Sequence, residues 1–198
     1  MPKDTFLNLS APKKEKMDMI LLDTFYNQSV SQVKVSHIVK QMEMSRGAFY
    51  KYFVDLEDAY AYVVKQQSIL IHQDILDYIA QYKNDFFHGI EQYLIFCSHL
   101  ETDSAYWKGL LLLTRADYQR TMRRLNLDES SYMLKEWISL LRNNEFQIHE
   151  TQEAVSFLYF IMEVVMNSLT DFIINDWTPE ELIMDYHYKI KWIIKGIK

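Results

Sequence analysis

The chain has 198 residues, of which 49% are hydrophobic, 15% aromatic and 24% charged, and this composition excludes a mini-protein and a disordered chain. With only four Gly and three Pro, it also lacks the turn residues of an all-β fold and the glycine-rich loop of an α/β nucleotide fold, so an all-α protein is predicted. The formal net charge is −6, yet residues 1–53 hold eight Lys or Arg and five Asp or Glu, a net charge of +3. A basic N-terminal part on an acidic remainder is typical of a protein whose N-terminal part meets a polyanion, although chance gives such imbalances too.

Cysteine usage and hydropathy predict a cytoplasmic protein with no membrane contact. Cys97 is the one cysteine, which excludes an internal disulfide framework and is normal in a reducing compartment. The first residues contain no apolar leader segment. The uninterrupted apolar run at 157–162 is far shorter than the ~20 residues that span a bilayer.

The first third of the chain predicts three short helices. Residues 1–12 contain two prolines, and we expect them to form a flexible arm. Apolar residues at helical spacing then predict helices over 13–27, 35–42 and 46–53. Ser45 ends the three-residue turn before the third helix and is a suitable N-cap. We therefore expect a helical head over 13–54.

The remaining chain, 55–198, predicts a larger helical bundle. A capping box at 178–181 begins the last helix, because Thr178 and Glu181 are spaced to bond each other's backbone. Apolar periodicity predicts helices over 57–81, 84–100, 104–113, 151–175 and 179–197, with one or two more within 115–143.

The second and third short helices have the lengths and the turn of a helix-turn-helix motif, whose second helix enters the DNA major groove. Arg46 can bond a guanine edge or a phosphate, and Gly47 lets the backbone approach the duplex. Solvated charge and half-buried aromatics are the alternative reading of these residues. The sequence predicts contacts to double-stranded DNA from Lys34, Ser36, Ser45, Arg46, Gly47, Tyr50, Lys51 and Tyr52.

Residues 17–60 resemble the DNA-binding region of the tetracycline-repressor (TetR) family. The resemblance centres on residues 45–53 (SRGAFYKYF) and extends to residues 35–39 (VSHIV) and Phe25. The sequence departs from the family pattern at Ser29, Lys34, Glu43 and Leu56, and the family's turn glycine is replaced by Glu43. The resemblance implies a homodimeric transcriptional regulator, favouring a repressor, that binds a palindromic operator and is modulated by a small-molecule effector.

The helix over 151–175 is apolar nearly all round, which predicts burial on two sides. We expect one side to meet a second copy of the chain, as the resemblance also implies; complete burial within one subunit is the alternative. The predicted dimer interface comprises Phe157, Ile161, Val165, Leu169, Phe172, Tyr186, Ile190 and Ile193.

The resemblance also implies a small-molecule pocket within residues 84–143, a region rich in aromatic residues. The alternative is an ordinary core, because aromatic side chains at helical spacing more often belong to a core than to a ligand site. The candidate effector-binding residues are Tyr106, Trp107, Arg115 and Tyr118.

The sequence predicts no catalytic residue, no metal site and no cofactor. Its six His are scattered, without an H-E-x-x-H pattern or a His/Cys pair at zinc spacing. The remaining alternative is a helical interaction module that has lost DNA binding and acts through protein partners. Salt-dependent binding to duplex DNA distinguishes these two functions, because phosphate contacts weaken steeply with salt.

Overall fold

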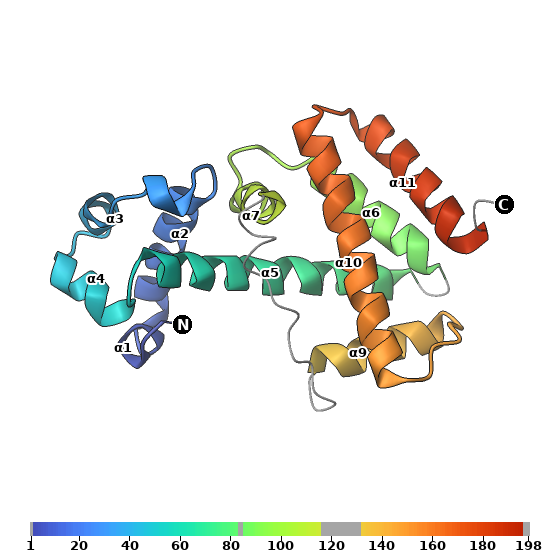
Figure 1. The fold of residues 1–198 in the computed structure, drawn as a ribbon, viewed down its shortest axis with the longest axis horizontal. Helices are drawn as coiled ribbons and strands as arrows, with labels where there is room; N and C mark the ends of the chain where they lie inside the picture. Colours follow the sequence, from blue (N-terminus) through green and yellow to red (C-terminus); the bar gives the residue numbers. More distant parts are fainter. Residues whose placement is uncertain (1, 83–84, 116–131, 196–198) are drawn as a thin grey trace. The chain divides into compact units, whose positions relative to one another are not determined.

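The computed structural model describes residues 2–82, 85–115 and 132–195. Within these ranges the regular structure is helical and contains no strand, which confirms the predicted all-α class (Figure 1). The chain divides into two compact units, one formed by residues 1–69 and 101–122 and the other by residues 70–100 and 123–198. We call these the first and the second unit.

The first unit contains the basic part of the chain. Its helix α2 contacts both α3 and α7, and α4 contacts α3 and α1. Its elements are α1 (Asp4–Leu7), α2 (Ala11–Phe25), a 3-10 turn (Val30–Gln32), α3 (Val35–Gln41), α4 (Arg46–Tyr52), the first part of α5 (Leu56–Gln81) and α7 (Ala105–Thr114).

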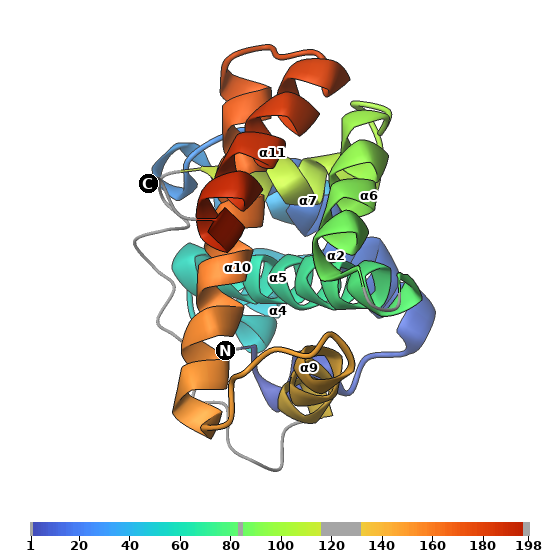
Figure 2. The ribbon, with the colours of Figure 1, turned by 90° about the vertical axis from the view of Figure 1, so that its right-hand side faces the viewer.

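The second unit is built around α10, which contacts α6, α9 and α11 (Figure 2). Among the hydrogen bonds that connect these elements, Trp137 Nε1 donates to the carbonyl of Ala154 at 2.8 Å, and the Tyr186 hydroxyl donates to the carbonyl of Phe87 at 2.8 Å. Its elements are the rest of α5, α6 (Phe86–Ser98), α9 (Tyr132–Asn143), α10 (Thr151–Ile174) and α11 (Pro179–Lys195).

Local signals placed the helix boundaries well. The predicted capping box is present, because the backbone N–H of Thr178 donates to Glu181 Oε2 at 2.7 Å and that of Glu181 donates to Thr178 Oγ1 at 3.3 Å. The two bonds satisfy donors that a helix start leaves unpaired. Of the one or two helices expected within 115–143, the structure has α9 over Tyr132–Asn143, and residues 116–131 lie outside the described residues.

The prediction of a flexible arm over residues 1–12 is wrong. Residues 4–7 form α1, and Phe6 is fully buried. Pro12 suggested irregular structure, but it lies in the first turn of α2. Backbone N–H groups there have no partner within the helix, so proline is tolerated at this position. Through Phe6, the segment is thus anchored in the first unit's core.

Helix α10 is, among the described residues, long and apolar enough to cross a membrane by length and composition alone. The core helix of a folded domain has the same composition. Ile161, Val165 and Leu169 of α10 are at most 1% exposed, because they pack inside the second unit. This burial is typical of a core helix.

Candidate nucleic-acid interface

Helix α4 has one buried face and one exposed face. Ser45 is its N-cap, and its Oγ accepts from the Ala48 backbone N–H at 3.2 Å, as the sequence predicted. Phe49 and Phe53 are fully buried and hold the helix against the unit's core. Four of the predicted DNA-contacting residues on this helix are exposed to solvent: Arg46, Gly47, Tyr50 and Lys51.

The turn between α3 and α4 keeps the geometry that usually requires glycine. Glu43 adopts a left-handed φ of 54°. Its N–H donates to the Lys40 carbonyl at 3.2 Å, and the N–H of Met44 donates to the Val39 carbonyl at 2.9 Å. These two bonds are the Schellman pattern, which satisfies the last carbonyls of α3. The departure at Glu43 thus leaves the turn closed, at the expense of a strained backbone.

The other predicted DNA-contacting residues differ in accessibility. Lys34, at the N-cap position of α3, and Ser36 are exposed. Ser45 is exposed too, although its hydroxyl is already bonded within the helix cap. Tyr52 is half-buried, with its ring edge-on to Phe6 at a centroid distance of 5.9 Å. Tyr52 is therefore the least accessible of the eight.

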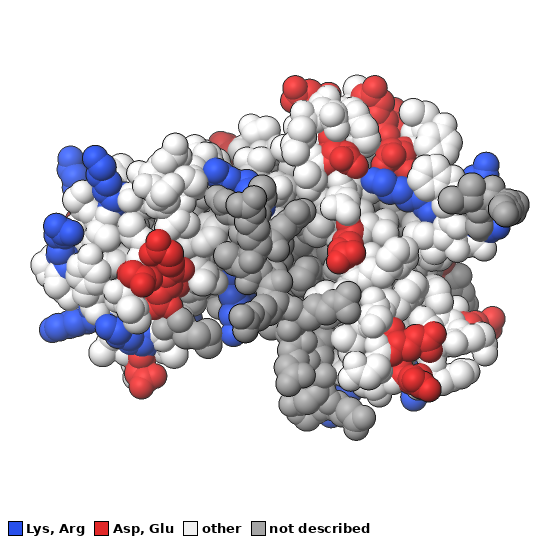
Figure 3. All heavy atoms as spheres, in the orientation of Figure 1, with Lys and Arg blue, Asp and Glu red and all other residues white. Residues whose placement is uncertain are grey.

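Basic side chains gather where α3 and α4 lie. On the face drawn in Figure 3, several blue groups lie along the edge of the first unit that carries these two helices, with red acidic groups beside them. Lys34, Lys40, Arg46 and Lys51 are all exposed on these helices or at their ends. The exposed face of α4 itself contains no acidic residue.

The candidate effector residues Tyr106, Trp107 and Arg115 lie on or directly after α7 and are half-buried, whereas Tyr118 lies outside the described residues. Sequence reasoning missed Lys108, which lies beside two of these candidates. Its Nζ donates to Asp23 Oδ1 of α2 at 2.6 Å and lies 5.5 Å from the centroid of the Tyr26 ring. Helix α7 is therefore bonded directly to α2.

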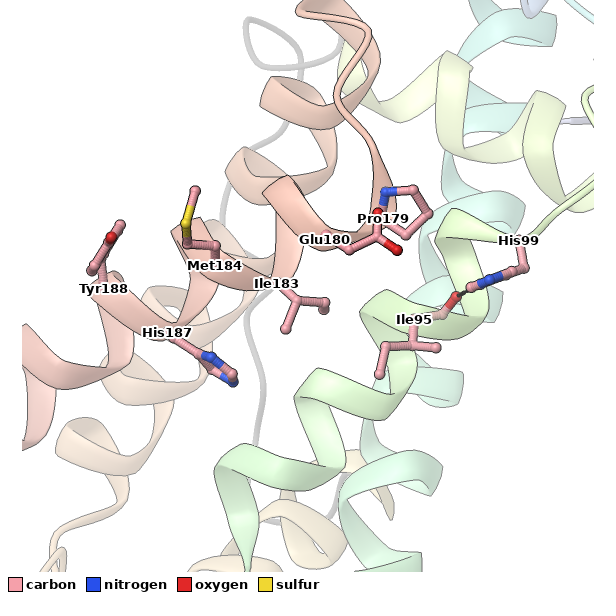
Figure 4. A pocket seen from close by; sticks show the side chains of 8 residues that line it. All are labelled: Ile95, His99, Pro179, Glu180, Ile183, Met184, His187 and Tyr188. Atoms are coloured by element: carbon pink, nitrogen blue, oxygen red, sulfur yellow. Dashed lines mark hydrogen bonds between the residues drawn. The ribbon is translucent and has the colours of Figure 1, made fainter.

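An open groove runs between α6 and α11 in the second unit (Figure 4). Ile95 and His99 line it from α6, and Ile183, Met184 and His187 are among the residues that line it from α11. His187 Nε2 lies 3.2 Å from Glu91 Oε2, and His99 Nδ1 lies 2.8 Å from the Ile95 carbonyl. No sequence motif pointed to this groove, because its lining comes from two helices far apart in the chain.

The residues named for the dimer interface need correction. Six of the eight are at most 9% exposed within their own subunit: Ile161, Val165, Leu169, Phe172, Tyr186 and Ile190. Phe157 and Ile193 are half-buried. Periodicity showed that α10 is apolar but did not show which of its sides packs against the core of the same subunit. The exposed large apolar side chains of the two last helices are instead Phe160, Ile174, Met184, Tyr188, Trp192 and Ile194.

The described residues offer little for nucleophilic or metal chemistry. Burial raises the pKa of the Cys97 thiol to about 12, so the thiol stays protonated near neutral pH. Across the described ranges, no three His, Cys, Asp or Glu side chains gather into a group that could hold a metal ion.

The helical architecture and the exposed face of α4 define a helix-turn-helix protein. Comparison with known proteins extends this to a family: the model described as "Tetracyclin repressor-like, C-terminal domain" matches residues 85–197, more than half of the chain. The chain belongs to the tetracycline repressor-like family. None of the curated proteins matches.

Among solved structures, a transcriptional regulator of the TerR/AcrR family from Aquifex aeolicus VF5 is 15% identical, with a TM-score of 0.51, covering 92% of this chain and 99% of that one. A TetR family transcriptional regulator from Chloroflexus aurantiacus J-10-FL is 17% identical, with a TM-score of 0.49, covering 97% of this chain and 90% of that one. The first likeness supports the same fold.

Proposed function

We propose that this protein is a homodimeric transcriptional regulator, in the first instance a repressor, that binds palindromic duplex DNA and responds to a small-molecule effector. The observation that carries the proposal is the division of α4 into two faces. Phe49 and Phe53 are buried and anchor the helix, while Arg46, Gly47 and Tyr50 are exposed and can meet a ligand.

The exposed face of α4 has the chemistry of a DNA-reading surface. Arg46 is in the first turn, where a guanidinium can bond a guanine edge with two N–H groups or clamp a phosphate. Gly47 leaves room for the backbone to approach, and Tyr50 and Lys51 can bond phosphates. The basic edge around α3 and α4 would attract a polyanion despite the net charge of −6.

Exposed apolar residues on α11 support dimerisation. Met184, Tyr188 and Trp192 recur every four residues, so they form one stripe along the helix, and the rings of Tyr188 and Trp192 are stacked with centroids 6.5 Å apart. Each is about half exposed, with 52%, 49% and 50% of its surface accessible. Phe160 and Ile174 on α10 are exposed as well. A second copy that covers these residues would give a dimer with two copies of α4, which reading paired half-sites requires.

The proposed effector response runs through α7. Tyr106 and Trp107 are half-buried candidates for contact with an apolar ligand, and the next residue, Lys108, is bonded to α2. A ligand that shifts α7 would therefore bias the position of α2 and of the helices that α2 contacts. The ligand lowers DNA affinity only if it binds better to the arrangement that does not fit the operator.

The test is a DNA-binding titration of the full chain at two salt concentrations. Duplexes that the wild-type protein enriches from a random-sequence pool serve as the specific probe. We expect Arg46→Ala and Tyr50→Ala each to lower affinity by about tenfold or more, and affinity of the wild type to fall steeply with salt. Lys135→Ala, which removes an exposed charge from α9, is the matched control and should bind as the wild type does.

Circular dichroism of each variant must show unchanged helicity for the comparison to count. A wild-type protein that binds no duplex at low salt would exclude the proposal and favour an interaction module. Equal affinity of Arg46→Ala, Tyr50→Ala and Lys135→Ala would show that DNA meets another surface.

A further inference from the structure

Residues near the start of the chain hold the C-terminal end of α4. The backbone N–H of Lys3 donates to the carbonyl of Tyr52 at 2.8 Å, and Lys3 Nζ donates to the carbonyl of Tyr50 at 2.8 Å. Thr5 Oγ1 donates to the carbonyl of Lys51. We call residues 3–7 the strap.

These bonds complete the hydrogen bonding of the α4 end. A helix leaves its last four carbonyls without partners inside the helix. In α4, the Phe49 carbonyl accepts from the N–H of Phe53 at 2.9 Å. The other three carbonyls, of Tyr50, Lys51 and Tyr52, are those that the strap satisfies. The ammonium of Lys3 also lies at the negative end of the helix dipole.

Packing fixes the strap in place. Phe6 is fully buried, and its ring centroid lies 4.8 Å from that of Phe53, 5.0 Å from Tyr62 and 5.9 Å from Tyr52. Tyr62, on α5, donates through its hydroxyl to Asp18 Oδ1 of α2 at 2.9 Å. Phe6 therefore connects the end of α4 to a pair of helices that are already bonded to each other.

The length of α4 explains why such a device matters. The helix has seven residues, too few to be stable without tertiary contacts. Ser45 caps the N-terminal end of the helix, and the buried side chain of Phe49 packs its middle against the core. The strap is the element that fixes the C-terminal end. Tyr50 and Lys51, whose carbonyls the strap holds, belong to the exposed face.

We propose that the strap positions α4 for reading a DNA sequence, with Phe6 as the positioning residue. The proposal rests on the proposed DNA-binding function. Base contacts need side chains in fixed places, whereas attraction to phosphates tolerates displacement, so loss of the strap lowers selectivity between DNA sequences more than general affinity for DNA. The strap acts from behind the helix, through the carbonyls and through Phe53, and Phe6 itself is inaccessible to DNA.

The experiment compares Phe6→Ala, Phe6→Leu and Thr5→Val with Leu7→Ala, a neighbouring control whose side chain is 51% exposed. Each full-length variant is titrated with the enriched duplex and with a random-sequence duplex of equal length, over a range of salt. Amide hydrogen exchange of residues 46–53 is measured without DNA. We expect Phe6→Ala to lower the ratio of specific to random affinity by about tenfold with an unchanged salt slope on random DNA, and to accelerate exchange in α4.

Phe6→Leu should recover most of the selectivity, Thr5→Val should show a smaller loss, and Leu7→Ala should behave as the wild type. Wild-type selectivity and exchange in Phe6→Ala overturn the proposal. A reduced salt slope in Phe6→Ala also overturns it, because the strap would then be a direct phosphate contact.

If Phe6→Ala loses its helicity, Thr5→Val decides: unchanged exchange and selectivity in that variant overturn the proposal. If the wild type binds neither duplex, the proposed function fails, and wild-type exchange in Thr5→Val would still overturn the strap's hold on α4.

Discussion

The ammonium of Lys108 on α7 lies 2.6 Å from the carboxylate of Asp23 on α2. The two residues are 85 positions apart in the sequence, so this contact joins two distant helices. This hydrogen bond, with the nearby charge of Asp23, raises the pKa of Lys108. The Tyr26 ring lies 5.5 Å from the same ammonium, so two residues of the α2 end contact one cation. The contact ties α7, with its effector candidates, to the helix that supports α3.

A double-mutant cycle of Lys108→Met and Asp23→Asn measures this contact. Because both side chains are partly solvated, we expect a coupling energy of only about 0.3–1 kcal/mol in urea unfolding, decreasing with salt. The pair Lys16 and Glu43, 3.7 Å apart and well exposed, is the comparison and should couple more weakly. Coupling no larger than that of this second pair would show that the Lys108 contact is not maintained in solution.

The strained turn predicts a stabilising substitution. Glu43→Gly should raise the free energy of unfolding by about 1 kcal/mol, because glycine adopts the φ of 54° without the steric penalty of a side chain. It also removes a negative charge between α3 and α4, which should raise DNA affinity. Glu43→Gln separates the two effects, since it removes the charge and keeps the strain. Equal stability of the Gly and Gln variants would mean that the turn is not strained.

A substitution at Gly47 should change stability and DNA affinity in opposite directions. A Cβ added there would meet only Ser45 Oγ, at an ordinary contact distance of 3.8 Å. Gly47→Ala should therefore leave the fold intact and stabilise α4 by up to about 1 kcal/mol, as alanine favours a helix. DNA affinity should fall, because the added methyl group stands between the helix and the duplex. Thermal unfolding and DNA titration of the same sample check both parts; undiminished DNA affinity would place Gly47 away from the duplex.

The sequence predicted the helices well because local chemistry sets their ends. Ser45 and Thr178 cap helices with their own side chains, and these bonds depend on residues three positions apart. The exposed face of α4 was predictable only in part: with Phe49 taken as core, helical geometry places Gly47 and Lys51 opposite it but leaves Arg46 and Tyr50 at the flanks, and only the structure shows that these two are exposed.

What sequence reasoning missed depends on contacts between distant residues. Phe6 lies in a short segment of mixed composition, and only its contacts with Phe53 and Tyr62 show that it belongs to the core. The same holds for the buried side of α10. Helix α10 is apolar on several sides, and only its neighbours α6, α9 and α11 decide which side is buried.

The dimer surface that we propose on α11 predicts two different outcomes for two similar substitutions. Trp192 is 50% exposed and belongs to the stripe on α11. Trp192→Glu places a charge in this stripe and should convert the proposed dimer to a folded monomer with weaker DNA binding. Phe172→Glu places the same charge at a position that is 9% exposed, and should lower the free energy of unfolding by about 3 kcal/mol or more.

Light scattering gives the mass of each variant and urea unfolding its stability. Met19→Glu, at an exposed position of α2, controls for added charge alone and should remain a dimer. A dimeric Trp192→Glu protein would exclude the stripe as the interface. A stable, monomeric Phe172→Glu protein would restore the face that the sequence first suggested.

His72 on α5 predicts how stability depends on pH. Burial lowers its pKa from 6.5 to about 4, although the residue keeps part of its surface exposed. The unfolded chain binds a proton near the ordinary pKa, whereas the folded chain holds the imidazole neutral until about pH 4. The stability that the neutral ring contributes is therefore fully present above pH 6.5 and is lost as the pH falls toward 4. The loss should be about 1–2 kcal/mol, less than the shift alone implies, because the site is partly solvated.

Urea unfolding of the wild type and of His72→Gln between about pH 7 and pH 4.5 measures this loss by difference, so the contributions of other groups cancel. The variant's stability should fall less steeply with acid. His149→Gln removes an exposed imidazole from the loop before α10 and should reproduce the wild-type slope. Parallel curves for the wild type and His72→Gln would mean that His72 binds its proton as readily in the folded protein as in the unfolded chain, and that its ring is hydrated.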